Sequence, residues 1–275
     1  MKLGLIGNPV DQSISPELQR ILFDMLNLQG YTYEKNDISH EKLNSFFEAF
    51  KAGSFDGINI TIPHKEHGLK FVDELDEKAE TLGNINCIKK TGKHLKGYNT
   101  DFYGFQMMLC FNNIDVASKR CLVLGAGGSS KTIIKALSDG KAASITVKNQ
   151  SMENALKIQS YVKNHMNVDI DLFNDVNQAF DVVINTTPLG MYEQEDKHDF
   201  FTIPLHNNSI LIDLIYTTNN TLFLEKHRNQ VKQCINGLDM LIFQAIKSIE
   251  IWTETTYNVS PQLDSIRKQL ENVLC

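Results

Sequence analysis

The chain has 275 residues, of which 42% are apolar and 22% charged, and its formal net charge is −6 at pH 7. This composition is typical of a globular protein with room for two domains, and the negative charge argues against binding to nucleic acid or to an anionic membrane. No apolar run approaches the roughly 18 residues of a membrane span, and the start of the chain is unlike a signal peptide. The five cysteines lack the spacing of metal ligands, so we expect reduced thiols, a cytoplasmic location and no metal.

The first hundred residues show the pattern of an α/β unit. Strands are predicted at 2–6 and 31–37, and helices from Pro16 onward and over 41–52. Ser13 and Ser15 stand between the first strand and the first helix. Ser15 suits an N-cap, with Pro16 in the first helical position. Capping explains Ser13 poorly, and the alternative is a pair of hydroxyls offered to an anionic ligand.

Residues 57–65, Gly-Ile-Asn-Ile-Thr-Ile-Pro-His-Lys, alternate with a period of two. The isoleucines at 58, 60 and 62 take one face of a strand, while Asn59 and Thr61 take the other. Pro63 ends the strand and Lys65 follows at once. An edge strand with one face in water would account for the polar side chains, and a binding site is the other hypothesis.

Two further polar residues lie near predicted strand ends. Asn86 falls within a strand predicted at 84–89, and Asp101 comes directly before a helix predicted at 102–109. An Asp in that position is most often an N-cap, which is the simplest interpretation of this residue alone.

The second half of the chain is organised around Cys121-Leu-Val-Leu-Gly-Ala-Gly-Gly-Ser-Ser-Lys131. A short apolar strand, a glycine turn and the start of a helix bring free backbone N–H groups to one point, where a diphosphate would bind. The G-x-G-x-x-G pattern is imperfect, because Ser130 takes the third position. Strands predicted at 144–147 and 180–185, with a helix over 152–163 between them, complete a βαβ series that predicts a dinucleotide-binding domain.

The remaining elements follow the same alternation. The loop 186–191 comes after a strand, where ligands bind in open α/β sheets. A strand is predicted at 209–213 and a helix at 221–229. Two helices, at 239–255 and 261–273, end the chain without strands of their own, so we expect them to pack back on the first domain.

Six motifs, in this order, together resemble the shikimate dehydrogenase family and cover the chain almost from end to end. They are Gly7-Asn-Pro-Val-Asp-Gln-Ser-Ile-Ser-Pro16, Asn59-Ile-Thr-Ile-Pro-His-Lys65, Gly97-Tyr-Asn-Thr-Asp101, Gly125-Ala-Gly-Gly128, Asn185-Thr-Thr-Pro-Leu-Gly-Met191 and Asn236-Gly-Leu-Asp-Met-Leu-Ile-Phe-Gln244. The resemblance implies an α/β fold of two domains with the substrate in a cleft between them. An α/β substrate domain, 1–102, would be completed by the C-terminal helices of 237–275, and a Rossmann-like parallel-sheet domain, 103–236, would bind NADP.

The resemblance also implies a role for each matching residue in the reversible reduction of 3-dehydroshikimate to shikimate. Lys65 and Asp101 would be the catalytic pair, since hydride transfer to a ketone needs a proton donor or a cation at the oxygen. Residues expected to bind substrate, or to support those that do, are Ser13 and Ser15 (at the carboxylate), Asn59, Thr61, Asn86, Tyr216 and Gln244. Residues expected at the cofactor are Gly125, Ala126, Gly127, Gly128, Ser129, Lys131, Asn149, Gln150, Ser151, Thr187, Gly190, Met191 and Gly237.

Cofactor choice depends on the segment Val147-Lys-Asn-Gln-Ser151. It holds no acid that would repel a 2′-phosphate, which favours NADP over NAD. Gln150, however, stands where the family commonly has an Arg that meets this phosphate. We therefore expect NADP to be preferred by a smaller margin than in relatives with Arg.

Two alternatives remain at this stage. One is a quinate/shikimate dehydrogenase that favours NAD, and the other is a nucleotide-binding regulatory paralogue without turnover. The serine pair favours shikimate over the bulkier quinate, and the intact Lys65 and Asp101 favour an enzyme. The expected partner is a small-molecule substrate, with no nucleic acid and no membrane, and the protein would be a monomer or a homodimer.

Overall fold

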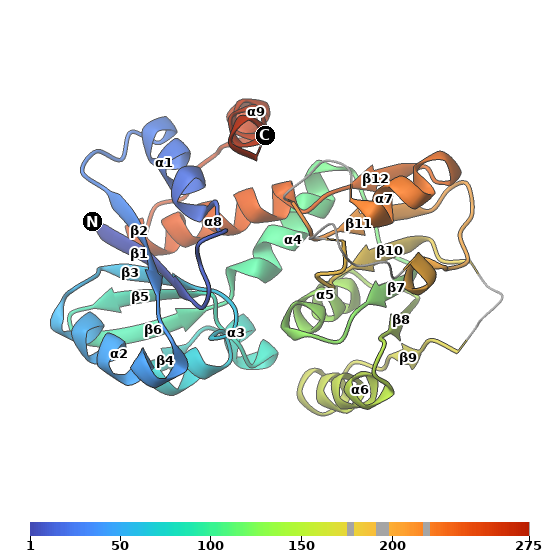
Figure 1. The fold of residues 1–275 in the computed structure, drawn as a ribbon, viewed down its shortest axis with the longest axis horizontal. Helices are drawn as coiled ribbons and strands as arrows, with labels where there is room; N and C mark the ends of the chain where they lie inside the picture. The colour runs from blue at the N-terminus through green and yellow to red at the C-terminus, as the bar shows by residue number, and fades with distance from the viewer. Residues whose placement is uncertain (175–178, 191–197, 217–220, 275) are drawn as a thin grey trace. The chain divides into compact units, whose positions relative to one another are not determined.

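The computed structural model describes residues 1–174, 179–190, 198–216 and 221–274, and the chain divides into two compact units. The first unit comprises Met1–Gly104 and Ile242–Cys275, so that both ends of the chain belong to it, and the second comprises Phe105–Leu241. Figure 1 labels the elements of each unit. No helix among the described residues is long and apolar enough to cross a membrane.

The first unit is built on a mixed six-stranded sheet. Its strands are β1 (Lys2–Gly7), β2 (Thr32–Asp37), β3 (Gly57–Ile60), β4 (Glu74–Leu75), β5 (Cys87–Thr91) and β6 (His94–Tyr98), in the order β2-β1-β3-β5-β6-β4. Strand β1 pairs in parallel with β2 and β3, whereas β5 is antiparallel to both β3 and β6. The helices and 3-10 turns of this part are α1 (Ser15–Met25), η1 (His40–Lys42), α2 (Leu43–Ala52), η2 (His67–Phe71) and α3 (Glu77–Leu82). Helix α4 (Thr100–Phe111) begins in the first unit and continues into the second.

This topology collects the polar segments of the first unit at one edge of the sheet. Strands β1, β3 and β6 run in the same direction, so the residues that follow them meet at their carboxyl ends. Because β5 runs the opposite way, Asn86, which precedes it, lies at the same edge. Strand order changes direction between β1 and β3, and such a switch point is where open α/β sheets bind ligands.

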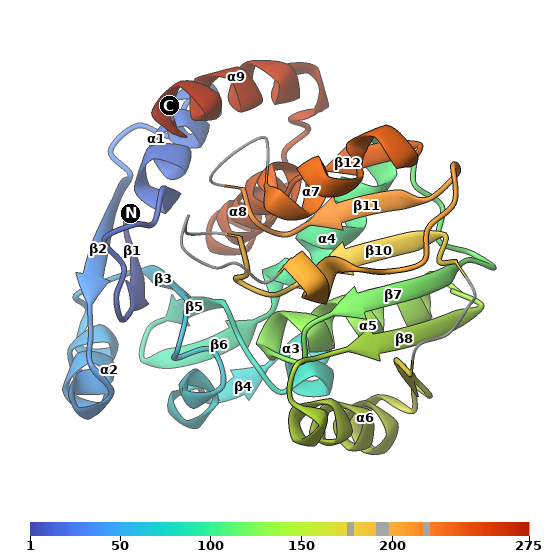
Figure 2. The ribbon, with the colours of Figure 1, turned by 45° about the vertical axis from the view of Figure 1, so that its right-hand side comes forward.

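The two faces of this sheet are covered differently. One face packs on α2 through a core that includes Phe47, Phe50, Ile58 and Ile60. On the other face lies α8 (Leu238–Thr253), whose Trp252 Nε1 donates to the Ile88 carbonyl at 3.0 Å. A Cβ on Gly57 would lie 2.3 Å from that indole nitrogen, so only glycine lets the helix approach so closely. Helix α9 (Leu263–Leu274) lies beside α1, as Figure 2 shows.

The second unit contains a six-stranded sheet that is parallel throughout. Its strands are β7 (Arg120–Leu124), β8 (Ser144–Lys148), β9 (Asp171–Leu172), β10 (Val182–Asn185), β11 (Ile210–Asp213) and β12 (Gln233–Ile235), in the order β12-β11-β10-β7-β8-β9. Counted along the chain, this is the order 3-2-1-4-5-6 of a dinucleotide-binding fold. Its switch point lies between β7 and β10.

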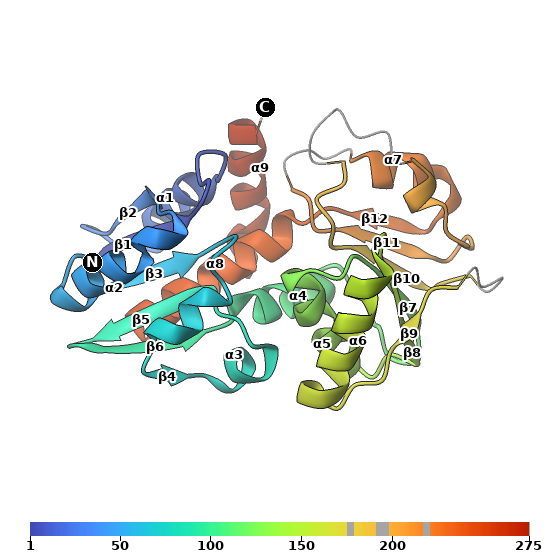
Figure 3. The same ribbon diagram turned by 60° about the horizontal axis from the view of Figure 1, so that its bottom comes forward.

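Helices cover the second sheet because its strands are apolar on both faces. Helices α5 (Gly128–Asp139) and α6 (Met152–Met166) pack against each other, as Figure 3 shows. On the other side, a cluster with Leu122, Val183 and Leu211 at its centre includes Phe223 of α7 (Leu222–His227). The smaller elements are the 3-10 turns η3 (His198–Phe201), η4 (Arg228–Gln230) and η5 (Ser260–Gln262), the last of which lies in the first unit.

Three local predictions were wrong. Strand β3 is interior rather than an edge strand, since β1 and β5 flank it, and it ends at Ile60, which leaves Ile62 73% exposed. Ser15 is the first helical residue of α1 instead of its N-cap, and the cap position holds Ile14 without a side-chain hydrogen bond. Strand β5 begins only at Cys87, so Asn86 lies in the loop before it.

Candidate active site

An ion pair in the candidate site joins two residues that the sequence motifs predicted to work together. Lys65 follows β3, and its Nζ lies 2.6 Å from Oδ2 of Asp101 in the first turn of α4. The side chains are 26% and 15% exposed, so a ligand could reach them while bulk water is partly excluded. Among the described residues Asp101 is the one hydrogen-bond partner of the ammonium, which leaves N–H donors for a ligand.

Asp101 is positioned by its neighbours and does not cap the helix. The cap of α4 is Asn99, whose Oδ1 accepts from the Phe102 N–H at 3.1 Å. Asp101 Oδ1 instead accepts from Asn86 Nδ2 at 2.8 Å, so each carboxylate oxygen has a donor. Asn86 is held in turn by the Thr100 N–H, which donates to its Oδ1 at 2.7 Å. The carboxylate is therefore fixed in one orientation toward Lys65.

Asn59 lies beneath this pair and is fully engaged by protein groups. Its Nδ2 donates to the Asn86 carbonyl and to Ser248 Oγ, both at 3.0 Å, and its Oδ1 accepts from the Tyr33 hydroxyl at 2.8 Å. With both amide hydrogens used, it supports Asn86 and offers no donor to a ligand. Burial raises the pKa of the Tyr33 hydroxyl well above its usual value, which keeps that hydroxyl a donor.

Gln244 and Thr61 complete this edge of the first unit. Gln244 Oε1 lies 3.5 Å from Thr100 Oγ1, which links helix α8 to the start of α4. Thr61 comes directly after β3, where its N–H donates to the Ile6 carbonyl at 2.8 Å. The structure thus connects Lys65, Asp101, Asn86, Asn59 and Gln244 through hydrogen bonds, and Thr61 stands at the end of the strand that leads to Lys65.

Ser13 and Ser15 form a pair of hydroxyls at the start of α1. Ser13 Oγ donates to Ser15 Oγ at 3.0 Å and accepts from the Ser15 N–H at 3.3 Å. Both residues are half-buried, the cap position between them holds Ile14, and the first helical N–H donates to Ser13 rather than being capped by Ser15. The interpretation of Ser15 as the N-cap is therefore wrong, and the pair stands beside the first-turn amides of a helix, which favour an anion.

The glycine turn after β7 leaves the N-terminus of α5 uncovered. Gly125 has a φ of +108°, and a Cβ there would lie 2.6 Å from Thr186 Oγ1, so both conformation and space require glycine. Gly127 and Gly128 differ, because a Cβ on either would meet nothing within 4 Å. These glycines and Ser129 are exposed, so the backbone at the start of the helix is accessible. Accessible backbone N–H groups at a helix start suit the close approach of a diphosphate.

Ser130 replaces the third glycine without loss of packing. It is fully buried, and its Oγ accepts from the Gly127 N–H at 3.2 Å and lies 2.7 Å from Thr186 Oγ1. The hydroxyl thus ties the turn to the strand end at β10. Ala126, the residue between the first two glycines, is half-buried.

A buried network holds the loop that follows β10. Asn185 Oδ1 accepts from the N–H and the hydroxyl of Thr187, at 3.0 and 2.7 Å, and its Nδ2 donates to Asp213 Oδ1 at 3.0 Å. Gly190 then takes a left-handed conformation with φ +90°. This network positions Thr187 beside the switch point of the sheet, whereas Met191 lies outside the described residues.

Asp213 links that network to α7. Its Oδ2 accepts from the Thr221 hydroxyl at 2.6 Å, and complete burial raises the pKa of its carboxyl to about 6. An ordinary unfolded Asp has a pKa of about 3.9. Between these values the folded state keeps a proton that the unfolded state loses, so the stability of the fold decreases as the pH rises from about 4 to about 6 and is level above that.

We expect Asp213→Asn to remove this pH dependence. Between pH 4 and pH 7 the free energy of unfolding of the wild type should fall by up to about 3 kcal/mol relative to that of the variant, since two pKa units correspond to roughly that free energy. Urea unfolding followed by circular dichroism at several pH values measures the difference. If the difference in free energy of unfolding between the two proteins stays constant over this range, the Asp213 carboxyl ionises as it would in water.

The segment expected at the adenosine end follows β8. Ser151 caps α6, because its Oγ accepts from the Asn154 N–H at 3.2 Å, and Asn149 Nδ2 donates to the Ser151 carbonyl at 2.9 Å. Gln150 between them is exposed. Lys148 turns away toward the Thr202 carbonyl, 3.0 Å from its Nζ.

Lys131 is the cation of the first turn of α5. Its Nζ lies 4.0 Å from the centre of the Tyr161 ring on α6. Lys131 thus lies near the start of the helix that follows the glycine turn, and its expected role at the cofactor stays a prediction.

Tyr216 follows strand β11 of the second sheet, and Gly237 follows strand β12. A Cβ on Gly237 would lie 2.2 Å from the Leu214 carbonyl oxygen, so the backbone segments before α8 and after β11 can meet only through glycine. Tyr216 is half-buried.

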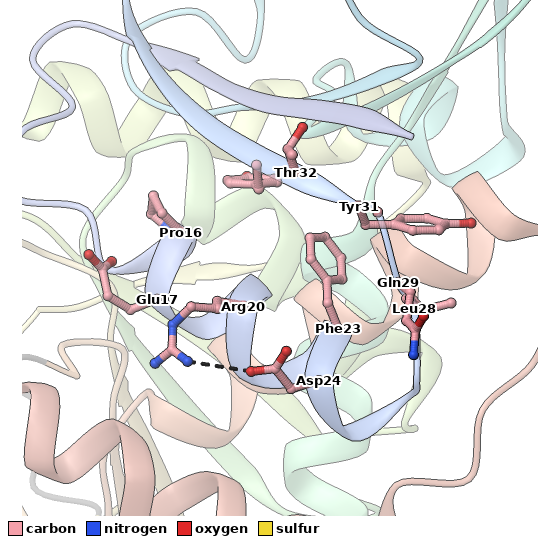
Figure 4. Close-up of a pocket in the computed structure, with 11 residues that line it drawn as sticks. Pro16, Glu17, Arg20, Phe23, Asp24, Leu28, Gln29, Tyr31 and Thr32 are labelled. Atoms are coloured by element: carbon pink, nitrogen blue, oxygen red, sulfur yellow. Dashed lines mark hydrogen bonds and ion pairs between the residues drawn. The ribbon is translucent and has the colours of Figure 1, made fainter.

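A separate pocket of about 500 Å³ lies between α1 and β2 (Figure 4). The predicted site residues are absent from its lining. Arg20 and Asp24, which point toward each other there, are 68% and 73% exposed. We therefore do not assign this pocket to the active site.

The sequence analysis missed two groups of residues. Thr100 and Ser248, which lie 3.3 Å apart, join the catalytic segment to α8, and only the fold brings residues so distant in sequence together. The second group is a cluster of three histidines, His40, His64 and His67. The sequence analysis expected no metal site. The spacing of His64 and His67 by three residues was the available signal.

The comparisons with known proteins agree with this geometry. Residues 5–88 match a profile described as the shikimate dehydrogenase substrate binding domain, and residues 109–214 match one described as shikimate / quinate 5-dehydrogenase. A protein named shikimate dehydrogenase (NADP(+)) from Methanococcus aeolicus is 35% identical over 277 residues, which cover 99% of this chain and 97% of the relative. The chain belongs to the shikimate dehydrogenase family.

Solved structures of shikimate dehydrogenases share the fold. The enzyme from Aquifex aeolicus superposes with a TM-score of 0.86 at 30% identity, with 97% of each chain covered. A shikimate dehydrogenase in complex with NADP+ gives a TM-score of 0.88 at 30% identity, covering 100% of this chain and 96% of that one. The family membership and the α/β fold class predicted from the motifs are confirmed.

Proposed function

We propose that the protein catalyses the reversible reduction of 3-dehydroshikimate to shikimate with NADPH, a step of aromatic amino-acid biosynthesis. The observation that carries the proposal is the Lys65–Asp101 pair at the ligand-binding edge of the first sheet, 2.6 Å between Nζ and Oδ2. An oxidoreductase of this kind, with NADP as its cofactor, is confirmed by the names of the relatives.

The first unit would bind the substrate. In this proposal the hydroxyls of Ser13 and Ser15 take the carboxylate, while Thr61, Asn86, Gln244 and Tyr216 contact the ring hydroxyls or support such contacts. Asn59 acts only through Asn86, since both of its amide hydrogens are already donated. Small hydroxyl donors at a helix start can bind a carboxylate without an Arg.

Lys65 and Asp101 would act on the carbonyl that receives the hydride. Reduction places negative charge on the carbonyl oxygen, and an ammonium beside it stabilises that charge and can supply the proton. Asp101 Oδ2 accepts from the ammonium, and Asn86 Nδ2 donates to Asp101 Oδ1, which keeps the carboxylate turned toward Lys65. In the reverse direction the same pair would accept the proton of the shikimate hydroxyl as hydride leaves.

The second unit fits a dinucleotide at the switch point of its sheet. NADPH supplies the hydride when it is bound. The open backbone at Gly127, Gly128 and Ser129 would take the diphosphate, Lys131, Asn149, Gln150 and Ser151 would face the adenosine part, and Thr187, Gly190, Met191 and Gly237 the nicotinamide part. The unfilled space above Gly127 and Gly128 is the structural feature that supports this placement.

A single set of assays tests the proposal against both alternatives. Purified protein is given shikimate or quinate with NADP or NAD, and reduced cofactor is followed by absorbance. We expect the shikimate and NADP combination to have the highest kcat/KM. Preference for quinate with NAD would indicate the first alternative, and no turnover in any combination would indicate a regulatory paralogue; the names of the relatives favour neither.

The size of the NADP preference should depend on Gln150. We expect Gln150→Arg to tighten NADPH by about tenfold or more, because a charge-assisted hydrogen bond to the 2′-phosphate is worth roughly 1.5–3 kcal/mol. NADH, which lacks that phosphate, should bind as before. KM for both cofactors in the wild type, Gln150→Arg and a neutral control, Gln150→Asn, gives the answer, and an unchanged NADPH/NADH ratio would place the phosphate elsewhere.

The remaining features of the proposal concern the setting of the enzyme. We propose a cytoplasmic protein that acts as a monomer or a homodimer, without nucleic acid. The net charge of −6 supports the absence of a nucleic-acid partner.

A further inference from the structure

Three histidines from separate segments meet at one end of the first sheet. His40 begins η1 after β2, His64 lies in the turn after β3, and His67 begins η2. One ring nitrogen of each residue lies within 4.8 Å of one ring nitrogen of each of the others. We propose that this cluster binds a divalent transition metal of the kind that prefers imidazole, such as Zn²⁺.

His64 already has the arrangement of a metal ligand. The residue is 1% exposed, and its Nε2 lies 2.6 Å from the Ile38 carbonyl, to which only an Nε2–H can donate. The neutral ring then carries a bare lone pair on Nδ1. That Nδ1 is buried and has no hydrogen-bond partner in the structure. A buried acceptor left unpaired is costly, and a metal ion would satisfy it.

His67 repeats the pattern with its nitrogens exchanged. Its Nδ1 lies 3.3 Å from the Pro63 carbonyl, so a proton on Nδ1 leaves the lone pair on Nε2. Metal-binding histidines commonly donate their second nitrogen to a backbone carbonyl, which fixes the tautomer and the ring orientation. Two of the three rings are thus oriented by the backbone in the way such sites require.

His40 supplies the third ring from an exposed position. Its ring centre lies 4.5 Å from that of His67, at an angle of 67°. Ligand nitrogens about 2.0–2.1 Å from a tetrahedral Zn²⁺ are roughly 3.4 Å apart, so nitrogens up to 4.8 Å apart would have to approach by up to about 1.4 Å. Rotation of the exposed His40 ring can provide this movement, while the buried His64 stays in place.

The ligand set indicates the class of metal. Three neutral imidazoles and one open position for water are suited to Zn²⁺, Cu²⁺ or Ni²⁺, whereas Mg²⁺ and Ca²⁺ require oxygen ligands. The site is built on a constrained turn, since the His64 N–H donates to the Thr61 carbonyl at 2.9 Å and the Gly68 N–H to the His64 carbonyl at 2.8 Å. A bound metal would join this turn, which carries Lys65, to η1.

The test uses tag-free full-length protein treated with a chelator and then titrated with Zn²⁺ in a calorimeter. We expect one Zn²⁺ per chain in the wild type. His40→Gln and His67→Gln should each weaken this binding by at least about tenfold, by analogy with the loss of groups that support metal ligands. The matched control is His165→Gln, which removes an exposed histidine of the second unit and should leave Zn²⁺ binding unchanged.

A second measurement is independent of calorimetry. Zn²⁺ should raise the midpoint of thermal unfolding of the wild type and of His165→Gln, because a ligand stabilises the state that binds it. The rise should disappear in His40→Gln and His67→Gln, and Mg²⁺ should produce none. Wild-type protein that takes up no Zn²⁺, or binding that persists in both cluster variants, would show that the three rings only pack against one another and would overturn the proposal.

Discussion

Replacing Lys65 with alanine is expected to lower kcat by at least about 100-fold, the lower end of the range for lost acid–base assistance. If Lys65 acts at the carbonyl oxygen as proposed, the variant leaves the alkoxide without this cation, and it leaves the Asp101 carboxylate, 15% exposed, without its partner. Binding of shikimate should change much less, since its carboxylate and ring hydroxyls keep their other partners. Steady-state kinetics and calorimetric titration with shikimate separate the two effects.

A matched lysine controls for the loss of an ion pair as such. Lys89, on β5 of the same unit, pairs with Glu254, and its side chain is 14% exposed. Lys89→Ala should therefore keep kcat close to that of the wild type. A Lys65→Ala enzyme that also retained near-normal kcat would refute the catalytic role of this residue.

The second large effect is expected from Ser13→Ala combined with Ser15→Ala. If both hydroxyls bind the substrate carboxylate, two charge-assisted hydrogen bonds of roughly 1.5–3 kcal/mol each are lost, which corresponds to a KM for shikimate at least about 100-fold higher. The fold and the affinity for NADPH should be kept, because the cap position of α1 is Ile14 and only one first-turn N–H, that of Ser15, loses a side-chain acceptor.

The control for this pair is Ser45→Ala, which removes a hydroxyl of α2 that donates to the Lys42 carbonyl. It should alter neither KM nor kcat. An unchanged KM in the double variant, together with a lower melting temperature, would mean that the serines only stabilise the start of α1.

Periodicity predicted the elements that have strong patterns of their own. The helices near 41–52 and 152–163 and the strands β7, β8, β10 and β11 of the second sheet were recognised because apolar residues recur at the helical spacing or in short branched runs. Strand β6 and the short strands β4, β9 and β12 were missed. Strand β6 reads His-Leu-Lys-Gly-Tyr and gains its stability from pairing with β5, which no local pattern reveals.

In the candidate site, too, some features could be predicted from the sequence and others depend on tertiary contacts. Lys65 and Asp101 were predicted as a pair from motifs, yet the interpretation of Asp101 alone as a cap was wrong, because Asn99 supplies the cap two residues earlier. The choice between two capable side chains depends on tertiary contacts, here those of Asp101 with Lys65 and Asn86. Similarly, the interior place of β3 follows from the pairing of β5, and Asn59 is paired with Ser248, 189 residues further along the chain.

The packing of α8 on the first sheet also has a consequence for synthesis on the ribosome. Gly57 packs against Trp252 and Asn59 donates to Ser248, and both partners lie on α8, which is translated after the second unit. The face of the first sheet that α8 covers is therefore exposed in the nascent chain until the whole second unit has been translated. At ordinary elongation rates that delay is on the order of ten seconds. The second unit, contiguous in the chain, can fold during this interval. The unit begun first is thus the last to be completed, and in the meantime its uncovered face is the part of the nascent chain most in need of a chaperone.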